Sequence, residues 1–261
     1  MMIPVPLDLS TARILVSNDD GINAPGLVVL EEVARSLSED VWVVAPETEQ
    51  SGAGHSLTLQ RPLRIRKLGE RRFCVDGTPT DCVMLAVNEI ITGRRPTLLL
   101  SGVNRGANMG EDITYSGTVA AAMEGTLLGV PSVALSLVCP DREKPRWETP
   151  RRHAAGLIRR LVTAPWPANT LMNVNFPDIE ADDVTGVRAA GQGQRKLGNN
   201  IIKNEDPRGR AYYWVGTARD EDSSLPGTDI NVVYAGGIAV TPIYMDMTHR
   251  AALAELETLF P

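Results

Sequence analysis

Cysteine is scarce in this sequence, and the spacings typical of disulfide-stabilised or zinc-binding proteins are missing. The three cysteines, Cys74, Cys82 and Cys139, are an odd number and contain no C-x-x-C pair. A disulfide framework or a cysteine-rich zinc site is therefore not expected. We interpret Cys74 and Cys82 as core thiols, and we expect a reducing compartment, the cytoplasm, as the location.

Long hydrophobic runs are also missing. No segment approaches the roughly 20 apolar residues that a membrane-spanning helix needs. The first residues, MMIPVPLDLSTAR, lack the basic start, apolar stretch and cleavage site of a secretion signal. We therefore expect no membrane partner.

An excess of positive charge is the third absence. The net charge is −6 over 261 residues, which argues against a nucleic-acid polymer as partner, because binding to its backbone needs clustered Lys and Arg. The chain also has no G-x-x-x-x-G-K-[ST] loop, and no G-x-G-x-x-G follows its first strand. A small anionic ligand in a local site remains compatible with this composition.

The sequence does contain a regular alternation of short apolar strands and amphipathic helices. Strands are expected at 13–17, 41–45, 97–101 and 132–138, with a hairpin formed by 64–67 and 72–75. Helices are expected around 27–37, after a capping box at Thr78 and Asp81, at 117–128 and around 153–161. This order predicts right-handed βαβ units and an α/β fold with a mostly parallel sheet.

The regular alternation of strands and helices ends in the last third of the chain. Strands are expected at 211–215 and 238–241, and a last helix at 248–259. We predict a catalytic core at 1–185 and a C-terminal extension at 186–261. The extension is interpreted as an arm that embraces a second subunit.

Four polar loops follow the predicted strands, at 18–21, 46–56, 101–110 and 112–118. In an open α/β sheet, ligands collect outside the carboxyl ends of the strands. Asp19 and Asp20 are adjacent there, and they repel unless a cation lies between them or one is protonated. With the Ser51 hydroxyl and the Asn104 carbonyl, their oxygens favour Mg²⁺, Mn²⁺ or Ca²⁺ over zinc. An isolated Asp-Asp-Gly is typical of a surface turn, but the neighbouring polar loops favour a metal site.

The glycines in these loops offer backbone N–H groups without obstructing side chains. In YSGT, Ser116, Gly117 and Thr118 stand at a predicted helix N-terminus, which favours a phosphate or similar anion. Each glycine-rich loop taken alone is typical of an ordinary turn. Two side chains have open roles: His55 is either catalytic or structural, and Arg105 either binds phosphate or is solvated.

Four long motifs together resemble the SurE family of nucleotidases: ILVSNDDGINAPG, VVAPETEQSGAGHSLT, VDGTPTDCVMLA and LLLSGVNRGANMGEDITYSGTVAAAMEG. The match continues through PSVALS, NVNFP, YYW and TPI, and so covers nearly the whole chain. The resemblance implies a Rossmann-like, three-layer α/β/α core with a C-terminal swapped arm, assembled as a dimer or tetramer. The segment 181–228 matches less sharply, which leaves base preference and assembly contacts open.

The resemblance also implies an activity and a site. The implied enzyme is a 5′-nucleotidase, a metal-dependent phosphatase that hydrolyses nucleoside 5′- and 3′-monophosphates; some members of the family also trim short polyphosphate. One Mg²⁺ or Mn²⁺ per subunit, with Ca²⁺ as a substitute in crystals, is implied at Asp19, Asp20, Ser51 and Asn104, and the two aspartates are the catalytic residues. The expected phosphate or substrate contacts are Asn18, Gly52, Asn108, Ser116, Gly117 and Thr118.

One question of mechanism and two other functions stay open. We favour attack by water, with Asp19 or Asp20 taking its proton, over attack by an aspartate that forms a covalent intermediate. A nucleotide-binding regulatory module would hold the ligand without hydrolysing it. An aspartyl-phosphate phosphatase usually has its two aspartates separated by one residue, whereas here they are adjacent.

Overall fold

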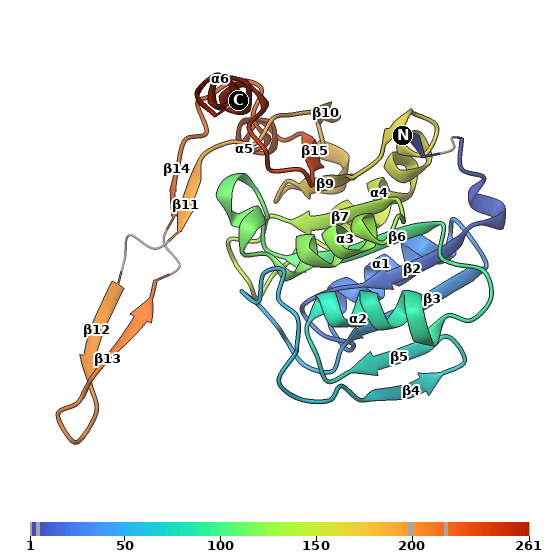
Figure 1. The fold of residues 1–261 in the computed structure, drawn as a ribbon, viewed down its shortest axis with the longest axis horizontal. Coiled ribbons are helices and arrows are strands. Elements are labelled where there is room, and N and C mark those ends of the chain that lie inside the picture. The colour runs from blue at the N-terminus through green and yellow to red at the C-terminus, as the bar shows by residue number, and fades with distance from the viewer. Residues whose placement is uncertain (1, 4–5, 198–200, 217–218, 261) are drawn as a thin grey trace.

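The structure is a computed structural model that describes residues 2–3, 6–197, 201–216 and 219–260. Its centre is a nine-stranded sheet with the strand order β10-β15-β9-β7-β6-β2-β3-β5-β4 (Figure 1). The seven inner strands are β15 (Ile238–Tyr244), β9 (Thr170–Phe176), β7 (Ser132–Leu137), β6 (Leu98–Arg105), β2 (Arg13–Ser17), β3 (Asp40–Pro46) and β5 (Arg72–Val75). The edges are β10 (Val187–Ala189) and β4 (Ile65–Gly69). Neighbouring strands are parallel except in the β15–β9 and β4–β5 pairs.

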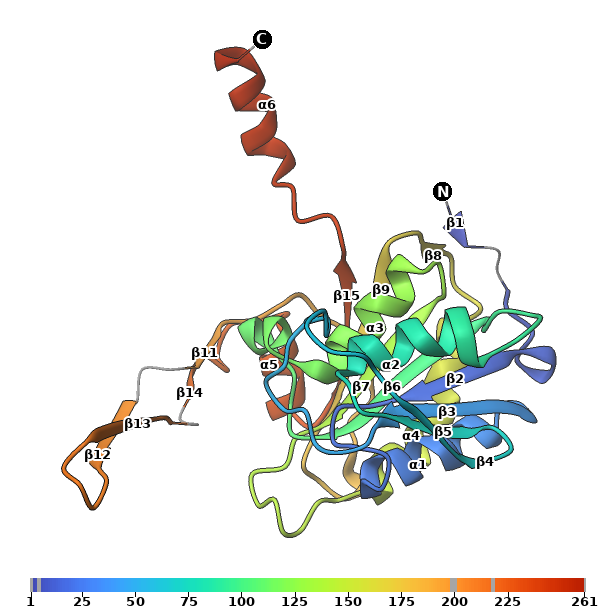
Figure 2. The ribbon, with the colours of Figure 1, turned by 60° about the horizontal axis from the view of Figure 1, so that its bottom comes forward.

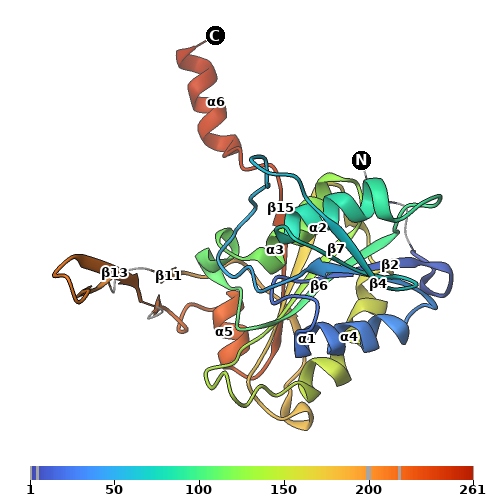
Figure 3. The same cartoon turned by 90° about the horizontal axis from the view of Figure 1, so that it is seen from below.

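Helices cover both faces of this sheet, which gives three layers (Figure 3). One layer contains α1 (Pro25–Arg35) and α4 (Glu148–Leu161), and the other contains α2 (Pro79–Leu85) and α3 (Gly117–Leu127). Each layer packs its own apolar cluster against the strands. The predicted α/β/α fold with a mostly parallel sheet is confirmed. In the part of the chain that the structure describes, no helix is long and apolar enough to traverse a bilayer.

Several predicted elements are confirmed with their local causes. The strand at 13–17 is β2, and 72–75 is β5, paired antiparallel with β4. The Thr78 side chain accepts from the Asp81 N–H, and the Asp81 carboxylate accepts from the Thr78 N–H, so the capping box opens α2. Strand β6 continues four residues beyond the predicted end at Ser101 and carries Asn104 within it.

The C-terminal segment contributes to the body and also projects from it. Strands β10 and β15 join the central sheet, and α5 (Asp229–Tyr234) lies beside it, so the predicted extension at 186–261 is partly built into the core. Two paired segments project away as an arm (Figures 1 and 2): β11 (Arg195–Leu197) with β14 (Arg219–Glu221), and β12 (Ile201–Glu205) with β13 (Ala211–Val215). Helix α6 (Arg250–Leu259) also leaves the body (Figure 2).

The remaining elements are short. Strands β1 (Met2–Ile3) and β8 (Trp166–Pro167) form a separate antiparallel pair. The short helices are η1 (Leu9–Thr11), the π-helical η2 (Ala86–Ile90), η3 (Gly110–Thr114) and η4 (Ala181–Asp183). Of these, η3 lies nearest the predicted site, because it joins the loop after β6 to α3.

Candidate active site

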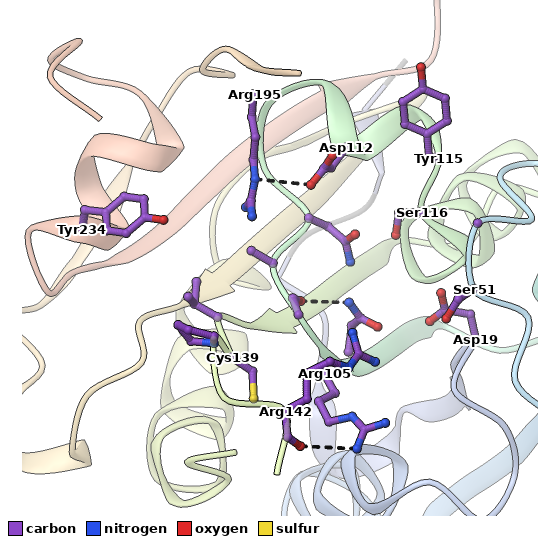
Figure 4. A pocket seen from close by; sticks show the side chains of 17 residues that line it. Asp19, Ser51, Arg105, Asp112, Tyr115, Ser116, Cys139, Arg142, Arg195 and Tyr234 are labelled. Carbon is purple, nitrogen blue, oxygen red and sulfur yellow. Dashed lines mark hydrogen bonds and ion pairs between the residues drawn. The ribbon is translucent and has the colours of Figure 1, made fainter. Parts of the chain in front are cut away.

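A cavity of about 460 Å³ opens where β2, β6 and β7 end (Figure 4). This is the carboxyl edge of the parallel strands, where a ligand is expected in such a sheet. Six of the predicted site residues line the cavity: Asp19, Ser51, Gly52, Asn104, Asn108 and Ser116. Its volume falls within the range of ligand pockets, roughly 300–1,000 Å³.

Asp19 is a buried carboxyl group in the lining of this cavity, with only 4% of its surface exposed. Burial raises its pKa to about 6, and the neighbouring Asp20 charge adds to the rise. Thr118 opposes both effects: its hydroxyl and its backbone N–H donate to the carboxylate. The N-terminus of α3 is therefore directed at Asp19, where its partial positive charge favours the ionised form.

Asp20 is half-buried and lies outside the cavity lining. Its Oδ2 accepts from the Arg105 backbone N–H at 3.2 Å. Burial raises the pKa of Asp20, and the charge of Glu49 adds to the rise, while Arg105 and Arg142 act against it. In the described parts of the chain, no basic side chain forms an ion pair with either aspartate at this strand end.

Ser51 lies on a long segment without regular structure, residues 47–64, that joins β3 to β4. We name this segment the strap. The strap is tied to the strand end by the Gln50 N–H, which donates to the Asp19 carbonyl at 2.8 Å. The Ser51 hydroxyl donates to Glu49 at 2.7 Å, so its oxygen lone pairs remain free. Asn104, from β6, donates through Nδ2 to the Gly106 carbonyl at 2.8 Å, which leaves its Oδ1 available.

The side-chain oxygens of Asp19, Asp20, Ser51 and Asn104 fit a divalent cation. Neither carboxylate has an ion-pair partner among the residues described, and both have raised pKa values, so their ionised forms are unfavourable in this environment. A cation bound between them would stabilise the ionised forms. The hydroxyl and amide oxygens add hard ligands of the kind that Mg²⁺, Mn²⁺ and Ca²⁺ bind. Within the described residues, no three His, Cys, Asp or Glu side chains gather as a metal site, so a cation here depends on Ser51 and Asn104 as well.

The helix N-terminus at YSGT is built as an N-cap. Ser116 Oγ accepts from the Val119 N–H at 3.0 Å, and its own O–H is left to donate to a ligand in the cavity. Gly117 faces Asp19: a Cβ at this position would lie 2.7 Å from Asp19 Cβ and 2.9 Å from Oδ2. Glycine therefore lets the helix approach the carboxylate. Thr118 is fully buried behind Asp19 and is its hydrogen-bond partner.

Asn18 shapes the turn that carries the two aspartates. It is buried, and its side-chain amide pairs with the peptide of Gly21, donating to the carbonyl at 3.0 Å and accepting from the N–H at 3.2 Å. Gly21 has φ of 100°, a conformation that residues with a Cβ adopt rarely. Of the predicted contacts, Asn18, Gly117 and Thr118 thus surround the aspartates and do not line the cavity.

The two residues with open roles are now placed. His55 Nε2 lies 3.0 Å from Glu124 of α3, and His55 is not part of the cavity lining. It therefore ties the strap to α3. Arg105 does line the cavity, and its guanidinium contacts the Arg142 carbonyl at 3.4 Å. Its position is compatible with binding an anion.

The sequence patterns missed much of the far wall of the cavity. Cys139 and Pro140 follow β7, so the rule that ligands bind at the carboxyl ends of strands should have indicated them. Arg195 and Tyr234 come from the C-terminal segment, and no local pattern marks them. Arg195 Nε lies 3.4 Å from Asp112 of η3 (Figure 4). It also lies 3.1 Å from Glu221, so Arg195 fixes the base of the arm against η3.

Comparison with known proteins gives one consistent result. The family model described as "Survival protein SurE" matches residues 14–199. The chain is 58% identical to a 5′-nucleotidase SurE of Paramagnetospirillum magneticum over 260 residues, a match that covers 100% of each chain. It is 54% identical to the protein of the same name in Rhodospirillum rubrum, over 97% of this chain and 98% of that one. The crystal structure of the SurE protein from Aquifex aeolicus superposes with a TM-score of 0.83 at 39% identity, covering 95% of this chain and 99% of the other.

Proposed function

The chain belongs to the SurE family, and from this premise we propose that it is a metal-dependent 5′-nucleotidase that hydrolyses nucleoside monophosphates to nucleoside and phosphate. The observation that carries the proposal is the position of Asp19. This carboxylate is buried, has no ion-pair partner among the described residues, lies next to Asp20, and lines a cavity of a size that accepts a nucleotide. Such an arrangement is unfavourable in an empty binding module and useful in a phosphatase.

In this proposal Asp19, Asp20, Ser51 and Asn104 hold one Mg²⁺ or Mn²⁺ ion. When bound, the ion neutralises charge on a phosphate oxygen and makes water more acidic. The remaining polar groups of the cavity position the phosphate: the free O–H of Ser116 and the amide of Asn108 donate to its oxygens. Arg105 extends the positive charge along the same wall.

Water, and not a carboxylate, is the proposed nucleophile. Thr118 holds the Asp19 carboxylate through two donors, and the Arg105 N–H holds Oδ2 of Asp20, which favours both aspartates as proton acceptors over attack on phosphorus. Asp19 or Asp20 takes a proton from the attacking water. The new P–O bond forms as the ester P–O bond breaks, and the proton taken by the aspartate passes to the leaving nucleoside oxygen, which restores the carboxylate.

The proposal extends to assembly and location. We propose that the chain acts as a homo-oligomer, a dimer or tetramer, in which the arm exchanges between subunits. The support is the apolar surface exposed on the arm, where Trp214 and Val215 are each 63% exposed. We also propose a cytoplasmic location, which fits the three free cysteines.

A substrate panel with defined metal ions tests the function. AMP and GMP should release phosphate in Mg²⁺ or Mn²⁺, and a chelator should abolish the release until metal is restored. A 3′-monophosphate and short polyphosphate belong in the panel as further substrates, and a simple sugar phosphate serves as the control. Nucleotide binding without phosphate release would identify a regulatory module, and full activity in chelator would remove the metal from the account.

A further inference from the structure

Three polar side chains occupy sheet positions that doubly wound folds ordinarily fill with apolar residues. Asn173 and Asn175 on β9 and Ser136 on β7 are all fully buried. The two asparagines alternate with Val174 and Phe176, which pack into the apolar cluster shared with α1 and α4. Because side chains alternate along a strand, the asparagines face the other side, and Ser136 is in register with Asn175 on that side.

All three side chains bind one residue of the cavity, Asn108. Asn175 accepts from the Asn108 backbone N–H at 2.9 Å and donates to the Asn108 carbonyl at 3.0 Å. Asn173 donates to the same carbonyl at 2.8 Å. Ser136 Oγ accepts from the Asn108 side-chain Nδ2 at 2.8 Å. The backbone and the side chain of Asn108 are therefore both fixed by the sheet.

This arrangement compensates for a local gap in the backbone pairing. Strand β6 ends at Arg105, so Asn108 lies beyond the last residue that a neighbouring strand pairs through its backbone. The Asn175 amide takes the place of a strand by pairing with both polar groups of the Asn108 peptide. Burying an amide without a partner is costly, so the asparagines and the loop depend on each other. Ser136 holds one hydrogen of the Asn108 amide and leaves the other for a ligand.

We propose that Ser136, Asn173 and Asn175 are positioning residues that act through Asn108, setting the amide at the place where phosphate binds. The inference rests on the proposed function, in which Asn108 contacts the phosphate. Loss of one contact lets the amide rotate or shift. Since a displacement of about 1 Å can cost about 100-fold in rate, we expect Ser136→Ala to lower kcat on the order of 10-fold. The KM for AMP should change less.

A double-mutant cycle between Ser136 and Asn108 tests this mechanism. Ser136→Ala, Asn108→Ala and the double variant are assayed for AMP hydrolysis in saturating Mn²⁺. If Ser136 acts through the amide, Ser136→Ala costs activity in the wild-type background and nothing further once Asn108 is alanine. Ser132→Ala is the matched control: it is the same substitution on the same strand, at a buried serine that bonds the Val130 carbonyl instead.

The outcomes separate the inference from the function on which it rests. Equal activity of Ser136→Ala and wild type, or losses that multiply in the double variant, would overturn the inference while leaving an active nucleotidase. If wild type does not hydrolyse AMP, the proposed function and the inference both fall. Should Ser136→Ala fold poorly, Ser136→Cys keeps the volume with a weaker acceptor, and the cycle with this variant supports or overturns the inference by the same comparison.

Discussion

Asp19 is the residue at which burial and charge oppose each other most directly. Its pKa is raised to about 6 because it is buried, and the hydrogen bonds from Thr118 offset only part of that rise. Above pH 6 the Asp19 carboxylate is ionised in the folded protein although it is buried. In the unfolded chain, water would solvate the same charge. Without a cation, this residue should therefore destabilise the fold at neutral pH, by about 3 kcal/mol for a rise of this size.

Replacing Asp19 by Asn should separate stability from activity. In chelator at pH 7.5, Asp19→Asn should have a larger free energy of unfolding than wild type, because the buried charge is gone. With Mn²⁺ present, wild type should hydrolyse AMP and Asp19→Asn should lack nucleotidase activity. The folded-state pKa lies above the unfolded one, so wild type should recover relative to the variant as pH falls from about 6 to 4. Urea unfolding across that pH range measures the difference.

Asp183→Asn, at an exposed position, is the control and should change neither property. An Asp19→Asn protein that is less stable than wild type in chelator at pH 7.5 would contradict this account of the site. The sequence was sufficient to predict that Asp19 and Asp20 lie at the carboxyl end of β2, because they follow a recognisable strand. It was not sufficient for the role of Thr118 toward Asp19, because that contact joins residues 99 positions apart.

At the scale of elements, the strap decides where Ser51 and Gly52 lie. It has no helix or strand, and it is held by a few contacts at separate points. The Gly54 N–H donates to the Tyr115 carbonyl at 3.1 Å, and the Thr58 N–H donates to Asp81 at 3.1 Å. The pair of His55 and Glu124 is a further tie, beside the Gln50 N–H bond to the Asp19 carbonyl. His55 therefore has a structural reason to be present next to the site.

Variants of His55 distinguish a tie from a catalytic group. His55→Gln can still donate to Glu124 and should keep near wild-type kcat, whereas His55→Ala loosens the strap. A partly exposed pair contributes up to about 1 kcal/mol, so His55→Ala should raise the Mn²⁺ concentration needed for half-maximal activity up to about 5-fold. Glu124→Gln is the matched change on the partner. A loss of 100-fold or more in His55→Gln would show that the imidazole takes part in the chemistry.

Elements with a simple apolar pattern were predictable, and β9 was not. Its sequence, TLMNVNF, interrupts the apolar run with Asn173 and Asn175. These asparagines are tolerated inside the sheet because their partner is Asn108, more than 60 positions away in the chain. The local sequence contains no sign of that partner. The same holds for α5, whose place depends on packing against β15.

At the scale of the whole molecule, the body is compact while the arm and α6 extend from it (Figure 2). The β12–β13 hairpin has two strands only, and such a hairpin is marginally stable by itself in water. Its Tyr213 and Trp214 are more than 60% exposed, as are Leu259 and Phe260 at the end of the chain. Apolar surface of this kind is typical of an interface with another chain.

Light scattering on the purified chain tests the proposed assembly. The full chain should have the mass of a dimer or tetramer, and Trp214→Glu should lower that mass or make it depend on concentration, because a charge enters the apolar surface. Arg208→Glu, in the same hairpin but outside its strands, is the control and should leave the mass unchanged. A monomeric wild-type protein at micromolar concentration would contradict the proposal.

The parallel sheet was predictable from the order of strands and helices, but its full width was not. Alternating βαβ units predict the parallel strands from β5 to β7. They do not predict that β15, more than 60 residues after β9, returns antiparallel to it and extends the sheet. Pairing between such distant segments depends on the complete core and leaves no local pattern in the sequence. The predicted boundary at 186 therefore separates strands that belong to one sheet.

We propose that Asp19 and Asp20 are compatible as neighbours because they bind a divalent cation together with Ser51 and Asn104. Anomalous diffraction from crystals grown with Mn²⁺ tests it most directly. We expect one strong manganese peak per chain, within coordination distance of oxygens from these four side chains. Density for water alone beside the two aspartates, in crystals of an enzyme that hydrolyses AMP in the same buffer, would contradict it.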